Sequence, residues 1–374
     1  RIIDFHKSNL HILNYSIPIK KTISSNELKK HLYSLREKPN SIPYVTSYYK
    51  KNWGFCVPHN LLKSFNDDTY NVHIDSTLKP GSLTYGEFLI KGKIKDEILI
   101  STYICHPSLC NDNLSGIVVT TMLAKLLSKI ETYYSYRFLF IPETIGAITW
   151  LSKNKKNLSK IKSGFVITCV GGNGTFTYKK TRNNDSEIDK ISIDVLKHSK
   201  KPFQTRDFFP YGSDERQYSS PGINLPIGVF MRTPYYEFKQ YHTADDNLDS
   251  IKKFALNDSL IMLFKIILEV EKKKPSFSIK QKNKISKSKS DVFQNLNPNC
   301  EPQLGRRKLY RNISKSRLVD KNNSENMIEL SICWVLNFSD GFHSLKEISK
   351  KSNLPLKLIQ KTAKLLVEKK LIKK

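Results

Sequence analysis

The pattern of apolar and polar positions divides the chain into several parts, and the first of them is built from short elements. Apolar residues alternate with polar ones over Asn9–Ile17 and again over Tyr70–Ile74, which predicts two strands. Ser24–Leu35 has helical spacing behind a capping serine, and Ser82–Ile90 leads into a further strand. We therefore predict a small β-rich domain over residues 1–95.

From residue 96 the pattern changes to an alternation of strand, loop and helix. Thr177–Asp189 is polar, and we predict no element there. The expected elements, in order, are a strand at Glu97–Cys105, a helix at Leu114–Ile130, a strand at Tyr136–Pro142, a helix at Gly146–Asn154, strands at Gly164–Val170 and Leu225–Met231, and a helix at Asp249–Lys273. Such alternation is typical of an α/β fold with helices covering a sheet, so we predict an α/β domain over residues 96–275.

The C-terminal part begins with a segment that has almost no apolar residues. The Lys/Ser run within Lys272–Ser290 predicts a basic linker, which we place at residues 276–300. Three short helices follow, at Met327–Leu336, Ser344–Ser352 and Leu356–Lys369. This succession is typical of a winged helix-turn-helix domain, expected over residues 301–374.

Composition changes this picture little. The 374 residues include 62 Lys+Arg and 34 Asp+Glu, a net charge of +28 that is denser after residue 270. Nucleic acid is a conceivable partner, but Lys, Asn and Ile are abundant throughout the chain, which favours a general compositional bias. No apolar run approaches the ~20 residues of a membrane span, so no membrane partner is expected. The six cysteines have no framework spacing and include no C-x-x-C pair, which favours a reducing, cytoplasmic location and argues against a structural zinc finger.

The chemistry is expected where three predicted strands end, because ligands of open α/β sheets bind beyond the carboxyl ends of strands. His106 and Asp112 follow the first of these strands, Glu143 follows the second, and His242 precedes the helix predicted at Asp249–Lys273. Two imidazoles and one carboxylate are suitable zinc ligands, and Glu143 could act as general base. Each residue also has a simpler interpretation; Asp112, for example, could merely cap the helix that follows it.

Taken together and in order, these residues resemble the co-catalytic zinc aminopeptidases, a group that includes bacterial leucyl aminopeptidases and glutaminyl cyclases. More closely, the chain resembles a bacterial family of aminopeptidase-like proteins with an inserted β-domain and a C-terminal winged helix. The stretches that carry the resemblance are Ser47–Cys56, Ser101–Ser108, Asn111–Gly116, Pro142–Ala147, Tyr211–Tyr218, Tyr241–Thr243 and Cys300–Gly305. The closer resemblance covers nearly the whole chain, and the one to proven aminopeptidases covers about residues 96–273. Members of the closer family usually carry further residues before position 1.

The resemblance implies a three-layer α/β/α domain and a zinc site, but the site departs from the family pattern. Proven aminopeptidases have a second glutamate ligand where this chain has Thr144, and an aspartate ligand where it has Cys169. We therefore expect one zinc ion per chain, bound by His106, Asp112 and His242. Cys169 would replace His242 if the metal lies nearer the first loop, although a small buried strand residue is the favoured interpretation.

Two neighbouring carboxylates remain open to interpretation. Asp214 or Glu215 would orient a ligand or recognise a substrate amine, unless both belong to structural ion pairs. His106-Pro-Ser108 also lacks the aspartate that the family places two residues after the first histidine.

The resulting functional prediction is a zinc-dependent, aminopeptidase-like hydrolase of a peptide or other amide bond, with Glu143 as general base. The β-rich domain would act as a lid that restricts the enzyme to small peptide or aminoacyl-type substrates, and a homo-oligomer is compatible with this prediction. Members of the family are often encoded in polysaccharide biosynthesis loci, which leaves an aminoacyl or acylamino sugar open as the source of the amide. The alternative is a degenerate peptidase fold that senses a ligand and regulates a partner through its winged helix.

Overall fold

The largest sheet lies in the middle of the chain and carries the residues of interest. The computed structural model describes residues 2–7, 9–48, 50–106, 108–275, 277, 291–310 and 324–374, so most of the predicted linker lies outside the described residues. Within them, seven strands pair in the order β10-β9-β11-β8-β6-β7-β5. The strands are β5 (Gly86–Ile90), β6 (Glu97–Tyr103), β7 (Ser135–Ile141), β8 (Ile161–Ile167), β9 (Phe176–Lys179), β10 (Phe203–Arg206) and β11 (Ile227–Met231). The central strands β7, β6, β8 and β11 run parallel, whereas β5 and β9 run antiparallel to their neighbours β7 and β11.

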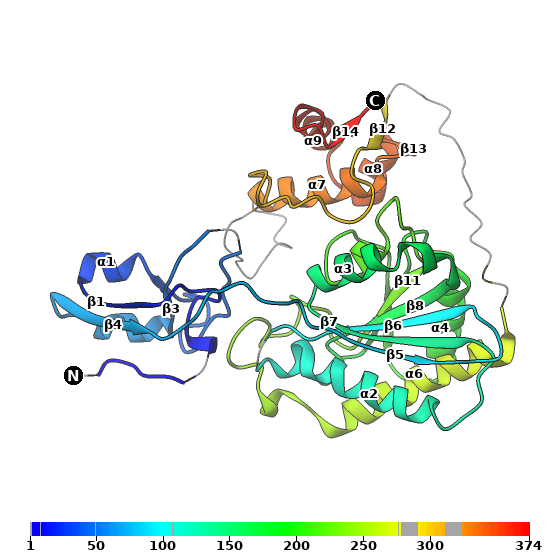
Figure 1. Cartoon of the computed structure of the whole chain (residues 1–374), viewed down its shortest axis with the longest axis horizontal. Coiled ribbons are helices and arrows are strands. Elements are labelled where there is room, and N and C mark those ends of the chain that lie inside the picture. The colour runs from blue at the N-terminus through cyan, green and yellow to red at the C-terminus, as the bar shows by residue number, and fades with distance from the viewer. Residues whose placement is uncertain are drawn as a thin grey trace.

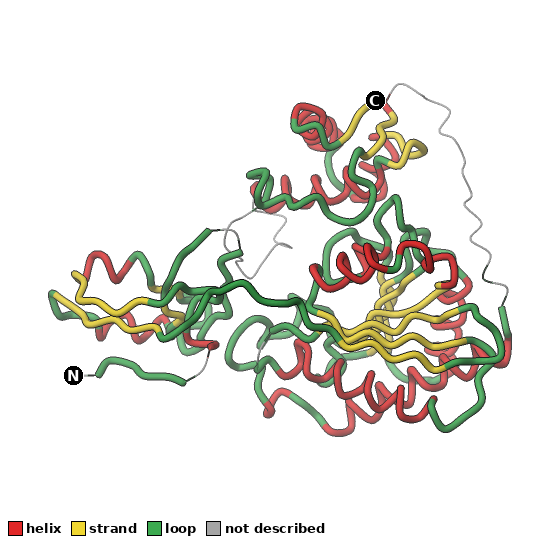
Figure 2. The backbone as a smooth tube through the Cα atoms, in the orientation of Figure 1, coloured by secondary structure: helices red, strands yellow, loops and turns green. Residues whose placement is uncertain are grey.

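Helices cover both faces of this sheet (Figure 1). One face packs against α2 (Ser115–Leu127), α4 (Glu187–His198) and α6 (Lys253–Lys273), and the other against α3 (Ile145–Lys153) and the short α5 (Glu215–Tyr218). Successive residues of a strand point to opposite faces. In β6, Ile98 and Ile100 accordingly join the first core and Leu99 joins the second. The expected α/β class and three-layer arrangement are confirmed, and Figure 2 shows the strands side by side between the helical layers.

Several elements of this domain differ from the expectation, and β10 and α5 have no predicted counterpart. The polar stretch Thr177–Asp189 contains β9 and the start of α4. The strand was hidden because its Lys179 is buried in an ion pair, and the start of α4 because it is a polar capping box built by Ser186 and Asp189. Gly86–Ile90, expected in the small β-rich domain, pairs with β7 as an edge strand of the large sheet.

The N-terminal part is small and has its own core. Strands β1 (Ile19–Ser24) and β4 (Thr69–Ile74) form an antiparallel pair, and β2 (Leu32–Tyr33) runs parallel to β3 (Phe55–Cys56). The helix predicted behind Ser24 is confirmed but short, α1 being Ser25–Lys29, and Asn9–Ile17 forms isolated bridges instead of a strand. The buried core residues are Ile23, Leu28, Trp53, Tyr70, Val72 and Ile74.

Short helical turns connect the elements of the chain. They are the 3₁₀ segments η1 (Asn9–His11), η2 (His59–Ser64), η4 (Lys155–Lys160) and η5 (Leu248–Ser250), and the π-helical turn η3 (Cys110–Leu114). Across the described residues, no helix combines the length and apolar character needed to cross a membrane.

The C-terminal part has the winged-helix arrangement that the sequence predicts. Its helices are α7 (Ser324–Phe338), α8 (Leu345–Ser352) and α9 (Leu356–Glu368). Strand β12 (Val292–Asn295) lies between β13 (Asp340–Ser344) and β14 (Ile372–Lys373), although residues 292–295 fall within the predicted linker. The extents predicted for the domains stay predictions.

The winged helix packs on the α/β domain of its own chain through polar and apolar contacts. Phe208 and Tyr211 of the α/β domain share a core with Trp334. Arg182 donates to Asn337 Oδ1 over 2.8 Å and to Asp340 Oδ2 over 2.7 Å, and its guanidinium lies 4.5 Å from the ring centre of Phe338. The side chains of Arg182 and Asp340 are only 7% and 10% exposed, so separating the two domains would leave both charges without their partner.

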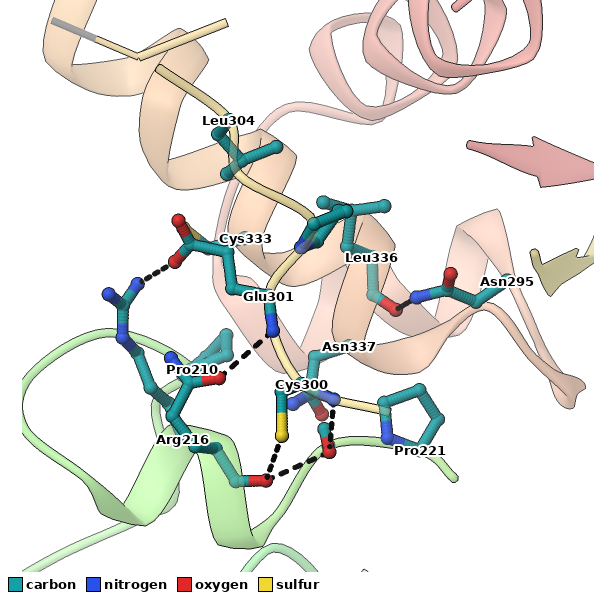
Figure 3. A pocket seen from close by; sticks show the side chains of 13 residues that line it. Pro210, Arg216, Pro221, Asn295, Cys300, Glu301, Leu304, Cys333, Leu336 and Asn337 are labelled. Atoms are coloured by element: carbon teal, nitrogen blue, oxygen red, sulfur yellow. Dashed lines mark hydrogen bonds and ion pairs between the residues drawn. The ribbon is translucent and has the colours of Figure 1, made fainter. Parts of the chain in front are cut away.

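A pocket opens at this junction, and Figure 3 shows its lining. Arg216 of α5 forms an ion pair with Glu301 over 2.6 Å, and Gln217 Oε1 accepts the backbone N–H of Glu301 over 2.9 Å. Cys300 and Cys333 lie on the side of the C-terminal part. These contacts extend the junction beyond the Arg182 ion pair.

Candidate active site

The parallel strands end at one edge of the sheet, and the predicted site residues follow them there. His106 lies three residues after β6, Asp112 lies in η3 at the entrance to α2, and Glu143 stands between β7 and α3. His242 comes from the loop that leads toward α6. The structure brings His106, Asp112 and His242 together, with one ligand atom from each lying within 4.8 Å of the others.

Asp112 and His242 have the closest contact of this group. Asp112 Oδ2 lies 3.2 Å from His242 Nε2, and both atoms are buried and have no hydrogen-bond partner among the described residues. The ring centres of His106 and His242 are 5.0 Å apart. Burial alone would raise the pKa of Asp112, but His106 and His242 outweigh it and lower the pKa to about 2. Asp112 is therefore ionised and faces two nitrogens, as a metal ligand would.

Two residues that sequence reasoning did not select hold Asp112 in place. Tyr103 donates its hydroxyl hydrogen bond to Asp112 Oδ1. Asp246 accepts the backbone N–H groups of Asn111 over 2.7 Å and of Asp112 over 2.9 Å. Tyr103 resembles an ordinary core residue of a buried strand, so its polar role carries no sequence signal. Asp246 lies four residues after His242 in the sequence, and this proximity was the signal that could have marked it as a site residue.

Cys169 lies behind the group. Its Sγ is 3.9 Å from Asp112 Oδ1, its side chain is fully buried, and Thr168 donates a hydrogen bond to its sulfur over 3.3 Å. Burial raises the pKa of the Cys169 thiol well above its usual value. These contacts fit a small buried residue next to the site, and Cys169 belongs to neither of the candidate ligand groups found among the described residues.

Glu143 lies on the open side of His106. Its carboxylate is 24% exposed, and Oε2 is 3.8 Å from His106 Nε2. Burial raises the pKa of Glu143 to about 7, with the carboxylates of Asp214 and Asp112 contributing in the same direction. A carboxylate with a pKa near neutrality is well suited to accept and return a proton.

The two neighbouring carboxylates, Asp214 and Glu215, have different surroundings. Asp214 Oδ1 accepts the backbone N–H of Thr144 over 2.6 Å, which holds the residue after Glu143 at a φ of +64°. Asp214 Oδ2 is buried without a hydrogen-bond partner in the described structure, and burial raises the pKa of Asp214 to about 7. Glu215 instead forms a buried ion pair with Lys179 over 2.6 Å. Asp214 therefore borders the site, and Glu215 has the structural contact that the sequence left open.

The N-terminal part also reaches the site, through Tyr44, a residue that sequence reasoning did not select. The ring centre of Tyr44 lies 5.3 Å from that of His106 and 5.3 Å from that of His242. Tyr44 N donates to His242 O over 2.8 Å, and Ala244 N donates to Ile42 O over 2.9 Å. Because these residues are about 200 positions apart in the chain, no local pattern could have paired them.

The fold and the arrangement of these side chains define an aminopeptidase-like α/β protein that carries a winged helix. Residues 10–273 match the family described as a domain of unknown function, DUF4910, and residues 291–374 match a winged helix-turn-helix family. The chain belongs to the DUF4910 family.

Known proteins support this assignment. A candidate polysaccharide biosynthesis protein with an aminopeptidase-like domain, from Clostridium acetobutylicum, is 47% identical over 373 residues, covering all of this chain and 80% of that protein. The crystal structure of a candidate peptidase from the same organism is 46% identical, with a TM-score of 0.69 over 98% of this chain and 78% of that one. A zinc aminopeptidase from Bacillus subtilis has a TM-score of 0.53 and 15% identity, over 66% of this chain and 65% of that one, which shows a shared fold. The resemblance that the sequence motifs indicated is thereby confirmed.

Proposed function

We propose that the protein is a zinc-dependent hydrolase of a peptide or other amide bond, with one zinc ion held by His106, Asp112 and His242. The observation that carries the proposal is the convergence of these three side chains at the carboxyl edge of an aminopeptidase-like sheet. Three protein ligands and one open position are typical of catalytic zinc. Tetrahedral zinc with bonds of ~2.0–2.1 Å sets neighbouring N and O ligands ~3.4 Å apart, close to the 3.2 Å between Asp112 Oδ2 and His242 Nε2. Zinc bound there would supply a Lewis acid and lower the pKa of a coordinated water.

The remaining residues have roles that follow from their positions. Glu143, next to His106 and partly open to solvent, would take the proton from the attacking water and return it to the leaving amine. Tyr103 and Asp246 would keep Asp112 oriented through hydrogen bonds. Asp214 would position Glu143 by holding the backbone N–H of Thr144.

The proposed substrate is small. The Tyr44 ring lies next to both imidazoles, so the N-terminal part would act as a lid that leaves little room for a folded protein or long peptide. An aminoacyl amide or a short peptide fits this arrangement. The description of the Clostridium acetobutylicum relative as a candidate polysaccharide biosynthesis protein supports including acylamino and aminoacyl sugars among the substrates tested.

Zinc binding and turnover test the proposal separately. We expect about one zinc per wild-type chain, loss of uptake in His106→Ala, and unchanged uptake in a control substitution of the exposed His73 to Ala. His242→Ala should weaken zinc binding at least ~10-fold. Full zinc occupancy with unchanged affinity in His106→Ala would refute the ligand assignment.

Turnover of aminoacyl amides and acylamino sugars tests the role of Glu143. Glu143→Gln should retain zinc and lose ~10²–10⁴-fold in kcat, the usual contribution of a positioned general base. A Glu143→Gln variant with wild-type turnover would exclude that role.

The winged helix supports a second candidate function, the binding of a polyanion such as duplex nucleic acid. On α9, Ile359, Ala363 and Leu366 are buried, whereas Lys357, Lys361 and Lys364 are exposed along one face. Such a face could contact phosphates. Duplex binding that weakens steeply with salt would support this function, and absence of binding at low salt would leave the winged helix with its packing role only.

A further inference from the structure

Cys105 has a position that the proposed mechanism does not use. It stands between β6 and His106, and its Sγ lies 3.3 Å from His106 Nδ1 and 3.9 Å from Glu143 Oε2. His106 Nε2 lies 3.8 Å from Glu143 Oε2. One ligand atom from each of the three residues falls within 4.8 Å of the others. A thiol, an imidazole and a carboxylate therefore converge beside the group formed by His106, Asp112 and His242.

We propose that Cys105, His106 and Glu143 form a second position for the metal ion, occupied in exchange with the first. This inference rests on the metal site of the proposed function and is independent of whether the protein hydrolyses an amide. The separations agree with a metal centre. In tetrahedral zinc, a sulfur bonded at ~2.3 Å and a nitrogen or oxygen bonded at ~2.0–2.1 Å lie ~3.6 Å apart. The Cys105 sulfur lies 3.3 Å from His106 Nδ1 and 3.9 Å from Glu143 Oε2, and these two distances bracket that value.

The chemistry of the three groups also suits a borderline-soft dication. Thiolate and imidazole are preferred ligands of zinc and bind cobalt as well, and a carboxylate completes the set. Coordination deprotonates a thiol, so Cys105 and Glu143 together would neutralise the two charges of the ion. Cys169 offers no comparable set, because it belongs to no group of three candidate ligands among the described residues.

The two groups share His106 and differ in their other two ligands, so a single ion would lie in one position at a time. When the ion is bound by Cys105 and Glu143, Glu143 is a ligand and cannot accept a proton from water. Asp112 and His242 would then keep the 3.2 Å contact between Oδ2 and Nε2. The position at Cys105 is therefore a resting position, and the position at Asp112 and His242 is the working one.

Cobalt loading of the full chain tests this assignment, since a thiolate bound to Co²⁺ gives a near-ultraviolet charge-transfer band. We expect that band in the wild-type protein and its loss in Cys105→Ser, which should still bind about one Co²⁺. Cys110→Ser and Cys169→Ser are matched controls and should keep the band. Asp112→Ala, which disables the working position only, should increase the band per bound ion.

The outcomes separate this inference from the proposed function. Cobalt binding without the band in the wild type, or a band that survives in Cys105→Ser, overturns the resting position and leaves the hydrolase proposal intact. If the band depends on Cys105 but the protein hydrolyses no amide, the resting position is supported and the proposed function is not. No cobalt binding at all would overturn both.

Discussion

Replacement of Arg182 by alanine should release the winged helix from the α/β domain. Arg182 donates to the side chain and backbone of Asn337 and to the carboxylate of Asp340, and its guanidinium lies over Phe338. Removing one partner of a buried ion pair costs ~3–5 kcal/mol, because the other charge stays buried. Asp340 keeps a contact with His343 at 3.0 Å, so we expect the lower end, ~3 kcal/mol. That is a ~10²-fold change in the equilibrium between docked and undocked domains.

Urea unfolding followed by two probes measures this loss. Trp334 lies at the junction and is buried, so its fluorescence, measured with Trp53 and Trp150 replaced by Phe, reports on undocking, whereas far-ultraviolet circular dichroism reports on the whole chain. In Arg182→Ala the fluorescence transition should move to lower urea and separate from the other transition. The matched control is Lys180→Ala, which removes a solvent-exposed ion pair with Asp207 and should cost no more than ~1 kcal/mol. Equal midpoints for the two variants would refute the reasoning.

Three further predictions follow from other contacts. Asp246→Ala should lower zinc affinity ~10–100-fold, because it frees the backbone N–H groups of Asn111 and Asp112. Chelator competition measures the affinity, and an affinity equal to that of the wild type would contradict the role of Asp246. Although burial opposes it, the contacts of Asp340 with His343 and Arg182 hold its pKa below the usual range. The stability that Asp340 contributes is therefore present at neutral pH and lost as the pH falls below ~4. The difference in urea midpoint between wild type and Asp340→Asn should accordingly shrink below that pH. A difference that stays constant with pH would show that the Asp340 charge is not its source. Lys361→Glu should abolish any duplex binding detected by fluorescence anisotropy at low salt while leaving zinc uptake unchanged; duplex binding of wild-type strength would show that this face of α9 is not the contact surface.

The α/β domain could be predicted because its central elements carry strong local patterns. Glu97–Tyr103 is an unbroken buried run, and α2 and α6 have apolar residues at helical spacing. β9 was not predicted, because Lys179 is charged and only its tertiary contact with Glu215 explains why this lysine is buried. Local pattern reports on burial, and it fails where a buried charge is neutralised by a distant partner.

The candidate site shows the same division. His106 and Asp112 were predicted from their place after a strand and His242 from its place before a helix, and the fold brings the three side chains together. Asp214 and Glu215 could not be told apart in sequence, because adjacent residues at the start of a short helix point in different directions. The role of Tyr44 depends on a contact between the N-terminal part and the loop of His242, which only the folded chain reveals.

The backbone pairing between Tyr44 and His242 also makes the opening of the site observable. Pro43 and Thr243 form an antiparallel bridge, flanked by the Tyr44 N–H to His242 O and Ala244 N–H to Ile42 O hydrogen bonds. Any movement that lifts Tyr44 from the imidazoles must break these two bonds together. The amide protons of Tyr44 and Ala244 should therefore show a common protection factor against exchange with solvent, which reports the free energy of that opening. A metal ion bound by His242 would slow that exchange in a segment 200 residues distant in the chain.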